Sequence, residues 1–176
     1  RAMVIYPPVD THEITPKKKE NVILSIGRFT HVHTAKKHEV LIAAYQSLVD
    51  QKKFLGWRLV LAGGMLPEDQ AYVEKLKQLA RNYQISILPN ISHKDLISWY
   101  GKTRMYWHAA GFGEKDPARM EHFGISTVEA MAAGAIPLVF AGGGLPEIVS
   151  NGKNGFLWTS IDELISQTTA LIKKSN

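Results

Sequence analysis

Two glutamates in one short stretch have the types and the spacing to do chemistry. Glu121 and Glu129 stand eight residues apart in EHFGISTVEAMAAG, residues 121–134. The apolar residues beyond the first glutamate recur with the spacing of a buried helical face, and they are Val128, Met131 and Ala132. We therefore expect a helix over 125–133. A surface helix with two solvated glutamates is the alternative, and the neighbouring residues argue against it.

The start of this predicted helix offers backbone donors next to the carboxylates. Amide N–H groups in the first turn of a helix have no intrahelical partner, and the helix dipole favours an anion there. The amides concerned belong to Phe123, Gly124, Ile125 and Ser126. Amides that bind phosphate, beside carboxylates that accept hydrogen bonds from hydroxyls, suit a nucleotide-linked sugar.

Apolar runs alternate with longer amphipathic stretches along the chain, which is typical of a parallel sheet covered by helices. We expect strands at 22–26, 58–62, 85–88, 105–108 and 136–140, and a short edge strand at 155–158. We expect helices at 36–50, 67–83, 94–100, 125–133, 146–149 and 160–173. The runs VILSI and LVLA are almost wholly apolar, as in strands buried on both faces. The predicted fold class is α/β, a Rossmann-like parallel sheet with helices on both faces.

Residues suited to ligand binding follow several of the predicted strands. They are Arg28, Gly63, Gly64, Asn90, the loop 109–120 and the glycines from Gly142 to Gly144. Ligands of such sheets bind at the carboxyl ends of the strands, which share one edge, so we expect a single site there. The loop 109–120 is the longest segment without predicted structure, and loops of this length are often functional. We expect it to be mobile, as either a lid or a tolerated insertion.

These motifs together resemble the donor-binding half of a large family of retaining glycosyltransferases, whose two facing Rossmann-like domains form the GT-B architecture. The segments that carry the resemblance are EHFGISTVEAMAAGAIP, GGGLPEIV and NGKNGF, with SIGRF and KKHEVLIAAY upstream. The opening VIYPPVD resembles the hinge strand that enters the second domain. The resemblance implies that residues 1–176 are the C-terminal nucleotide-sugar-binding domain, and that an N-terminal acceptor domain is absent from this chain.

The resemblance also implies roles for individual residues. It assigns the diphosphate to Arg28 and Lys36, whose guanidinium and ammonium groups bind phosphate oxygens. It assigns the sugar hydroxyls to Glu121 and the ribose hydroxyls to Glu129, which makes Glu121, Arg28 and Lys36 the catalytic set. The other expected binding residues are Phe123, Gly124, Ile125, Ser126, Asn90, Ile91, Ser92, Gly143 and Gly144. Of these, 90–92 are expected near the base, while the two glycines allow close backbone approach or form a tight turn.

No metal and no cofactor is expected, since the resemblance implies a donor bound by cationic side chains and helix amides. The chain agrees in having no Asp-x-Asp pair. His31, His33 and His38 suggest a metal site, but they fall in a predicted polar loop and helix start. Lys37 occupies a position that is commonly glycine or another small or polar residue in the family, so it ranks behind Lys36 for the diphosphate.

The resemblance implies a hexosyl donor carried on GDP or UDP, and the segments YPPVD and EHFG favour GDP-mannose. The expected partners are this nucleotide sugar and, through the absent domain, a glycan or lipid-linked acceptor. The chain alone is expected to bind nucleotide without being active. Two other functions stay open, a non-catalytic nucleotide-binding Rossmann module and a sugar-nucleotide epimerase or phosphorylase related to GT-B enzymes.

The composition narrows the classes of partner. The 176 residues carry a net charge of +5 and include no cysteine. The charge suits nucleotide phosphates or an acidic lipid surface, but the lysines form short clusters without interleaved aromatic residues, so no nucleic acid partner is expected. The lack of cysteine excludes disulfides and thiolate metal sites and is compatible with a reducing cytosol. We expect a cytoplasmic location and leave open an association with the cytoplasmic face of a membrane.

Overall fold

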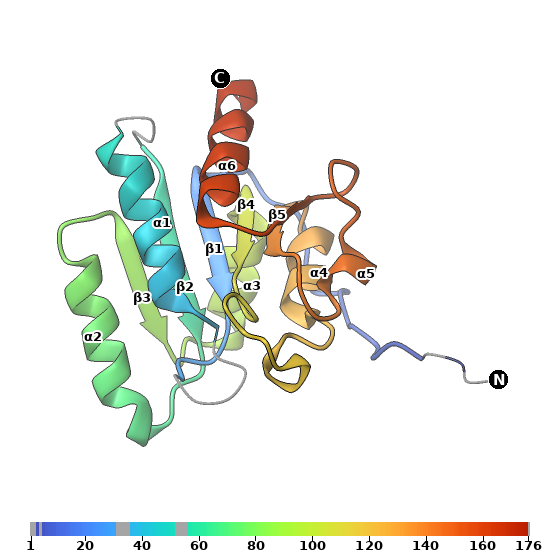
Figure 1. Ribbon diagram of the computed structural model, residues 1–176, viewed down its shortest axis with the longest axis horizontal. Helices are drawn as coiled ribbons and strands as arrows, with labels where there is room; N and C mark the ends of the chain where they lie inside the picture. Colours follow the sequence, from blue (N-terminus) through green and yellow to red (C-terminus); the bar gives the residue numbers. More distant parts are fainter. Residues whose placement is uncertain (1–2, 4, 31–35, 52–55, 176) are drawn as a thin grey trace.

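The chain folds into one parallel sheet with helices on both faces (Figure 1). The computed structural model describes residues 3, 5–30, 36–51 and 56–175. The strands are β1 Val22–Ile26, β2 Arg58–Gly63, β3 Ile85–Pro89, β4 Met105–His108, β5 Ile136–Phe140 and β6 Phe156–Trp158. The α-helices are α1 His38–Asp50, α2 Gln70–Ala80, α3 His93–Lys102, α4 Ile125–Ala132, α5 Leu145–Ile148 and α6 Ile161–Ser175. Two 3₁₀ helices, η1 Pro67–Asp69 and η2 Pro117–Arg119, lie in the connections.

The strand order is β3-β2-β1-β4-β5-β6, and every neighbouring pair is parallel. The sheet grows in one direction from β1 to β3 and in the other from β4 to β6, so the order reverses between β1 and β4. In sheets of this kind the reversal opens a crevice at the carboxyl ends of the two central strands, where ligands bind. The predicted fold class is confirmed.

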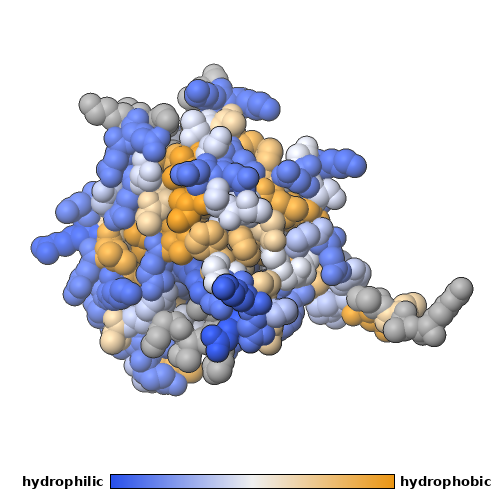
Figure 2. All heavy atoms as spheres, in the orientation of Figure 1, coloured by the Kyte–Doolittle hydropathy of each residue, from blue (hydrophilic) through white to orange (hydrophobic). Residues whose placement is uncertain are grey.

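Helices cover the two faces of the sheet in separate groups. Ile23 packs in a cluster with residues of α1, α2 and α6, whereas its neighbours Val22 and Leu24 pack with residues of α3 and α4. This alternation along β1 shows why the strands are apolar throughout, because both faces must be buried. Figure 2 shows polar residues around the rim of the α1, α2 and α6 face and apolar residues across its middle. Among the described residues, no helix is long and apolar enough to span a bilayer.

Several predicted boundaries were wrong for local reasons. The helix predicted at 36–50 begins at His38, because Lys37 has a left-handed backbone with φ 54° and ψ 45°. The helix predicted at 67–83 is divided, since Pro67 opens a 3₁₀ turn before α2 begins. Strands β1, β4 and β5 have their predicted bounds, and the remaining helices and strands differ from prediction by one or two residues at one or both ends. The expected hinge strand is also wrong, because residues 5–10 form no strand.

The loop 109–120, for which the sequence predicts no structure, contains local structure and a tertiary anchor. It contains η2, whose N-cap Asp116 accepts a hydrogen bond from the Ala118 amide at 3.0 Å. The aromatic ring of Phe112 packs against Phe140 and Trp158, with ring centroids 5.6 Å and 5.4 Å away. The prediction failed because this anchor is a tertiary contact, and the composition of the loop does not reveal it.

His38, at the start of α1, is fully buried in the core. Its ring stacks on Phe29 with centroids 4.7 Å apart, and its Nδ1 lies 3.4 Å from the Tyr72 hydroxyl. Burial lowers the pKa of His38 to about 4. The imidazole is therefore neutral in the folded protein near neutral pH.

We expect the free energy of unfolding to fall as the pH is lowered from about 6.5 towards 4. In this range the unfolded chain binds a proton on His38 and the folded chain does not, which costs at most about 1.4 kcal/mol per pH unit. Urea unfolding across this range measures the slope. The variant His38→Phe keeps a ring against Phe29 and cannot titrate, so it should show a shallower slope. An unchanged slope would contradict a buried neutral imidazole.

Candidate functional site

Two charged side chains and a histidine come together at the carboxyl ends of β1 and β4. Lys36 precedes α1, Glu121 precedes α4, and the Lys36 Nζ forms an ion pair with the Glu121 Oε2. His108, the last residue of β4, is buried, and its Nε2 lies 3.4 Å from the same carboxylate oxygen. The cluster therefore lies at the point where the strand order reverses, as the sequence predicted for Lys36 and Glu121.

The protonation states of this cluster follow from its surroundings. The nearby His108 imidazole and the charge of Lys36 hold the pKa of the Glu121 carboxyl well below its usual range, despite partial burial. Burial, with the charge of Lys36, lowers the pKa of His108. Neither ring nitrogen of His108 has a hydrogen bond of good geometry to any described residue. The site thus holds an ionised carboxylate, an ammonium group and a neutral imidazole.

Arg28 lies beside Lys36 at the end of β1. A Cβ placed on Gly27 would lie 2.4 Å from the Lys36 Cγ, so the aliphatic part of Lys36 rests directly on the Gly27 backbone. Arg28 is exposed, and its Cγ lies 3.9 Å from where Gly64 would carry a Cβ. In the part of the chain that the structure describes, its guanidinium has no ion-pair partner. Both predicted diphosphate ligands thus lie at one edge, and Arg28 is free to bind an anion.

The start of α4 leaves two of the amides named from the sequence without a backbone partner among the described residues. Gly124 is the N-cap, with φ 98° and no side-chain cap. The amides of Thr127 and Val128 donate to the Gly124 carbonyl oxygen, whereas those of Ile125 and Ser126 have no backbone acceptor among the described residues. These unpaired N–H groups lie a few residues beyond Glu121. The ring of Phe123 packs against Tyr6 with centroids 5.7 Å apart.

The glycines after β5 hold Glu121 and its neighbour in place. A Cβ on Gly143 would lie 2.0 Å from the Glu121 carbonyl oxygen, and one on Gly144 would lie 2.0 Å from that of His122. The Gly144 amide donates a hydrogen bond to the Glu121 carbonyl oxygen at 2.8 Å. The close backbone approach that the sequence predicts here is therefore an approach between two segments of the protein, and the contacts shown are not contacts to a ligand.

Glu129 lies on α4, facing α3. Its Oε2 accepts a hydrogen bond from the buried Tyr100 hydroxyl at 2.7 Å. Burial and this carboxylate raise the pKa of Tyr100, so the phenol stays a donor. Glu129 also lines a hollow of about 100 Å³ together with Asp10, Glu13, Ile14, His93 and Ile97. The carboxylate is thus fixed in orientation beside an open space.

The residues predicted near the base follow β3, which β2 and β1 separate from β4 in the sheet. Asn90 has a left-handed φ of 54°, and its side-chain amide bonds to both the Met65 amide and carbonyl, at 2.8 Å and 3.1 Å. Ser92 is the N-cap of α3 and accepts from the Asp95 amide at 3.1 Å. Their side chains hold the loops together, and half-buried Ile91 lies between them. They share the edge with the Lys36–Glu121 pair without contacting it.

The histidines that suggested a metal site do not form one with described residues. His38 is stacked in the core, and His31 and His33 lie outside the described residues. Within those residues, no group of three or more His, Cys, Asp or Glu side chains is placed to hold a metal ion.

The site residues expected from the sequence include neither His108, for which the sequence favours core packing or solvent exposure over ligand contact, nor Tyr100. His108 carried a usable signal, since it ends a predicted strand at the edge where ligands bind. Tyr100 carried none, because its hydrogen bond to Glu129 depends on how α3 packs against α4. Lys37, the second candidate for the diphosphate, is instead paired with Glu114 of the loop 109–120.

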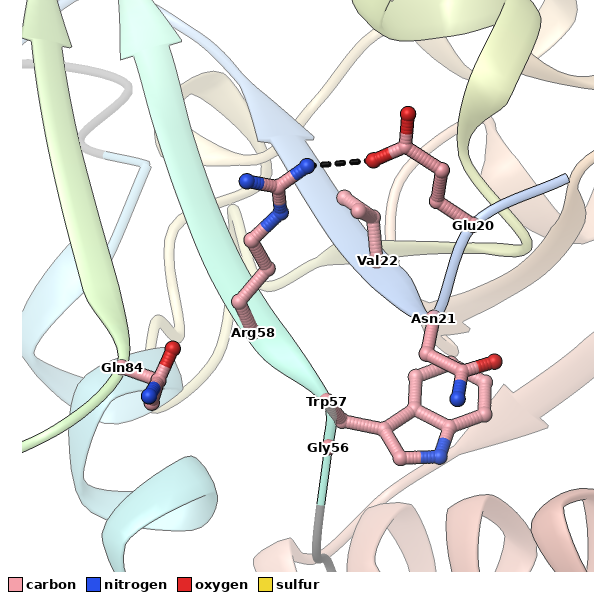
Figure 3. A pocket seen from close by; sticks show the side chains of 7 residues that line it. All are labelled: Glu20, Asn21, Val22, Gly56, Trp57, Arg58 and Gln84. Carbon is pink, nitrogen blue, oxygen red and sulfur yellow. Dashed lines mark hydrogen bonds and ion pairs between the residues drawn. The ribbon is translucent and has the colours of Figure 1, made fainter.

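A separate hollow of about 370 Å³ lies at the opposite edge of the sheet, beside the starts of β1 and β2. Figure 3 shows Glu20 and Arg58 turned toward each other there, and the two form an ion pair. Its other lining residues are Asn21, Val22, Gly56, Trp57 and Gln84. The charged side chains in its lining neutralise each other, so the hollow lacks the free cation that the carboxyl edge provides.

Comparison with known proteins matches nearly the whole chain to one family. A family model described as glycosyl transferases group 1 covers residues 10–175. The GDP-Man:Man(3)GlcNAc(2)-PP-Dol alpha-1,2-mannosyltransferase of Mus musculus is 33% identical over 155 residues, which are 80% of this chain and 30% of that protein. The protein of the same name from Kluyveromyces lactis is 30% identical over 162 residues, 80% of this chain and 26% of that protein. The chain therefore spans about a quarter to a third of these relatives.

Solved structures share the fold. The C-terminal domain of a glycosyl transferase group 1 family protein from Francisella tularensis has a TM-score of 0.72 at 23% identity, over 96% of this chain and 89% of that one. HepE from Anabaena, solved with UDP and glucose, has a TM-score of 0.70 at 23% identity, over 89% of this chain and 40% of that one. These likenesses show that the fold is that of one half of the GT-B architecture.

Gly143 and Gly152 form a matched pair for testing how Glu121 is held. Both have left-handed φ angles, +61° and +74°, so alanine strains the backbone at either. Only at Gly143 does the added Cβ meet other described atoms within 4 Å. We expect Gly143→Ala to lower the free energy of unfolding by about 1–3 kcal/mol more than Gly152→Ala, as measured by urea unfolding. Equal losses would show that the glycine loop does not rest on Glu121.

Proposed function

The chain belongs to the glycosyl transferases group 1 family, and we propose that it is the donor-binding domain of a hexosyltransferase. The observation that carries the proposal is the arrangement at the carboxyl edge of the sheet. There the Lys36–Glu121 ion pair lies near the exposed Arg28 and the unpaired amides at the start of α4. Cations and helix amides bind a diphosphate, and carboxylates bind sugar hydroxyls. The proposed ligand is therefore a nucleoside diphosphate hexose.

In the proposed reaction, the bond between the sugar C1 and the phosphate oxygen breaks, and its electron pair goes to that oxygen. The acceptor hydroxyl bonds to C1, and its proton passes to the released diphosphate or to solvent. Negative charge therefore grows on the leaving diphosphate, where Arg28, Lys36 and the α4 amides stabilise it. Because these groups supply the positive potential, we propose transfer without a metal ion. The family resemblance supports retention of configuration at C1.

Glu121 is proposed to act as a carboxylate throughout. Its pKa is held well below the usual range by His108 and Lys36, so it has no proton to give a leaving group near neutral pH. It instead accepts hydrogen bonds from donor hydroxyls and faces the positive charge that develops on the sugar. Glu129, oriented by Tyr100, is proposed to accept the ribose hydroxyls.

GDP-mannose is the donor that the comparisons favour. The names of the mouse and Kluyveromyces relatives, which are 33% and 30% identical to this chain, contain GDP-Man. The same names contain a dolichol-linked glycan, which supports a lipid-linked acceptor. We propose that acceptor contacts come from a second domain, in the part of the relatives that this chain does not match.

A donor panel tests the proposal directly. We expect isothermal titration calorimetry of this chain to show binding of GDP and GDP-mannose, and weaker binding of UDP and UDP-glucose. The reason is that the cationic edge recognises the diphosphate of all four, while the relatives' names point to guanosine. No heat with any of them at millimolar concentration would contradict a donor site. Binding of GDP with no preference for any sugar would favour a non-catalytic nucleotide-binding module.

Arg28→Ala tests the proposed diphosphate ligand. Loss of a charged hydrogen-bonding partner should weaken GDP binding about tenfold or more, while the free energy of unfolding changes little because the side chain is exposed. The matched control is Arg81→Ala, since exposed Arg81 follows α2 at the opposite edge of the sheet. Equal effects of the two substitutions on the calorimetric affinity would leave Arg28 with no role beyond net charge.

A further inference from the structure

The loop 109–120 is built onto the protein beside the donor site. The ring of Phe112 packs against those of Phe140 and Trp158, which also contact each other, at the carboxyl ends of β5 and β6. The Glu114 amide donates to the Gly111 carbonyl oxygen at 3.0 Å, which closes a turn after this anchor. The position of Glu114 is therefore fixed from within the loop, although the loop lies at the surface.

Glu114 reaches from this loop to the start of α1. Its Oε1 lies 2.5 Å from the Lys37 Nζ, and both side chains are largely covered, with 21% and 25% of their surface exposed. The hydrogen bond and charge of Lys37 lower the pKa of the Glu114 carboxyl, so the pair is ionised near neutral pH. Such a pair restricts the conformations of both side chains more than an exposed ion pair does.

Lys37 is a residue whose backbone needs support. Its φ of 54° is left-handed, which costs a residue with a Cβ more than it costs glycine. The Lys37 carbonyl oxygen accepts the Val40 and Leu41 amides that open α1, while no side chain caps the helix. Because of this turn, two adjacent lysines form ion pairs with different glutamates, Lys37 with Glu114 and Lys36 with Glu121. Both acids belong to the same connection between β4 and α4.

We propose that Glu114 is a positioning residue of the donor site, whose ion pair with Lys37 fixes the turn that directs Lys36 across Gly27 to Glu121. The inference rests on the proposed function, because it names a further residue of the same site. A purely local role for the ion pair, in holding the loop alone, is the alternative. If Glu114 positions the turn, its loss weakens the ion pair between Lys36 and Glu121. If its role is local, that ion pair stays unchanged.

The test compares Glu114→Gln with two other substitutions. Lys37→Gly removes the same ion pair and the backbone strain together, so the turn no longer needs Glu114. Asp116→Asn is the matched control, because it removes the same charge from the same loop and asparagine also caps η2. Asp116 has its ion pair with Arg119 instead of a lysine of the α1 turn. Two readouts are used, the NMR titration of the ¹³C-labelled Glu121 carboxyl and calorimetry with GDP and with inorganic pyrophosphate.

We expect Glu114→Gln to move the pKa of Glu121 towards its ordinary value and to weaken pyrophosphate and GDP binding about fivefold. Removing a negative charge near an anion site would otherwise tighten binding, which is the direction expected of Asp116→Asn. In the Lys37→Gly background, Glu114→Gln should no longer shift the Glu121 titration or weaken binding, and only the small tightening expected from the lost negative charge should remain. Thermal unfolding of each variant identifies any general loss of structure.

The outcomes separate this inference from the proposed function. Unchanged or tighter binding in Glu114→Gln, or an unchanged Glu121 titration, would overturn the positioning role while leaving a donor site intact. Additive effects of Glu114→Gln and Lys37→Gly would also overturn it. If the unaltered chain binds neither GDP nor pyrophosphate, the proposed function fails, and the Glu121 titration alone still decides whether Glu114 directs Lys36.

Discussion

The ion pair between Lys36 and Glu121 is the interaction on which the site depends. It joins the segment before α1 to the segment before α4, on the two sides of the point where the strand order reverses. A half-buried carboxylate loses solvation, and without a cation it would repel a diphosphate. Lys36 removes both difficulties at once, so the protein can keep an ionised Glu121 next to an anion-binding helix start.

Glycines make this pairing sterically feasible. Gly27 lets the aliphatic part of Lys36 lie against the backbone, and Gly143 lets the loop after β5 rest on the Glu121 carbonyl oxygen. Neither contact leaves room for a Cβ. The glycine pattern that resembled a ligand-binding motif therefore reports, at these positions, how closely protein segments must approach each other. A binding role and a packing role look alike in sequence, because both demand the same missing side chain.

The fold and its ligand-binding edge were predictable, since they follow from apolar periodicity and from the geometry common to parallel sheets. The roles expected of Arg28, Lys36 and Glu121 come from the family resemblance, and each of the three lies next to the end of a strand or the start of a helix. Glu114 was not found, because its importance arises from the ring of Phe112, which anchors the loop in the core. The start of α1 was placed too early, because residue propensities do not foresee a left-handed lysine.

The same ion pair bears on how a donor and its product would differ in the proposed site. A bound diphosphate competes with Glu121 for Lys36, and a carboxylate that loses its cation needs other donors of hydrogen bonds. The hydroxyls of an attached sugar supply them, whereas the diphosphate product does not. After transfer, Glu121 and the diphosphate would share one lysine, with Arg28 left as the other cation at the edge. On this reasoning Glu121 helps to bind the donor and also weakens the binding of the diphosphate product.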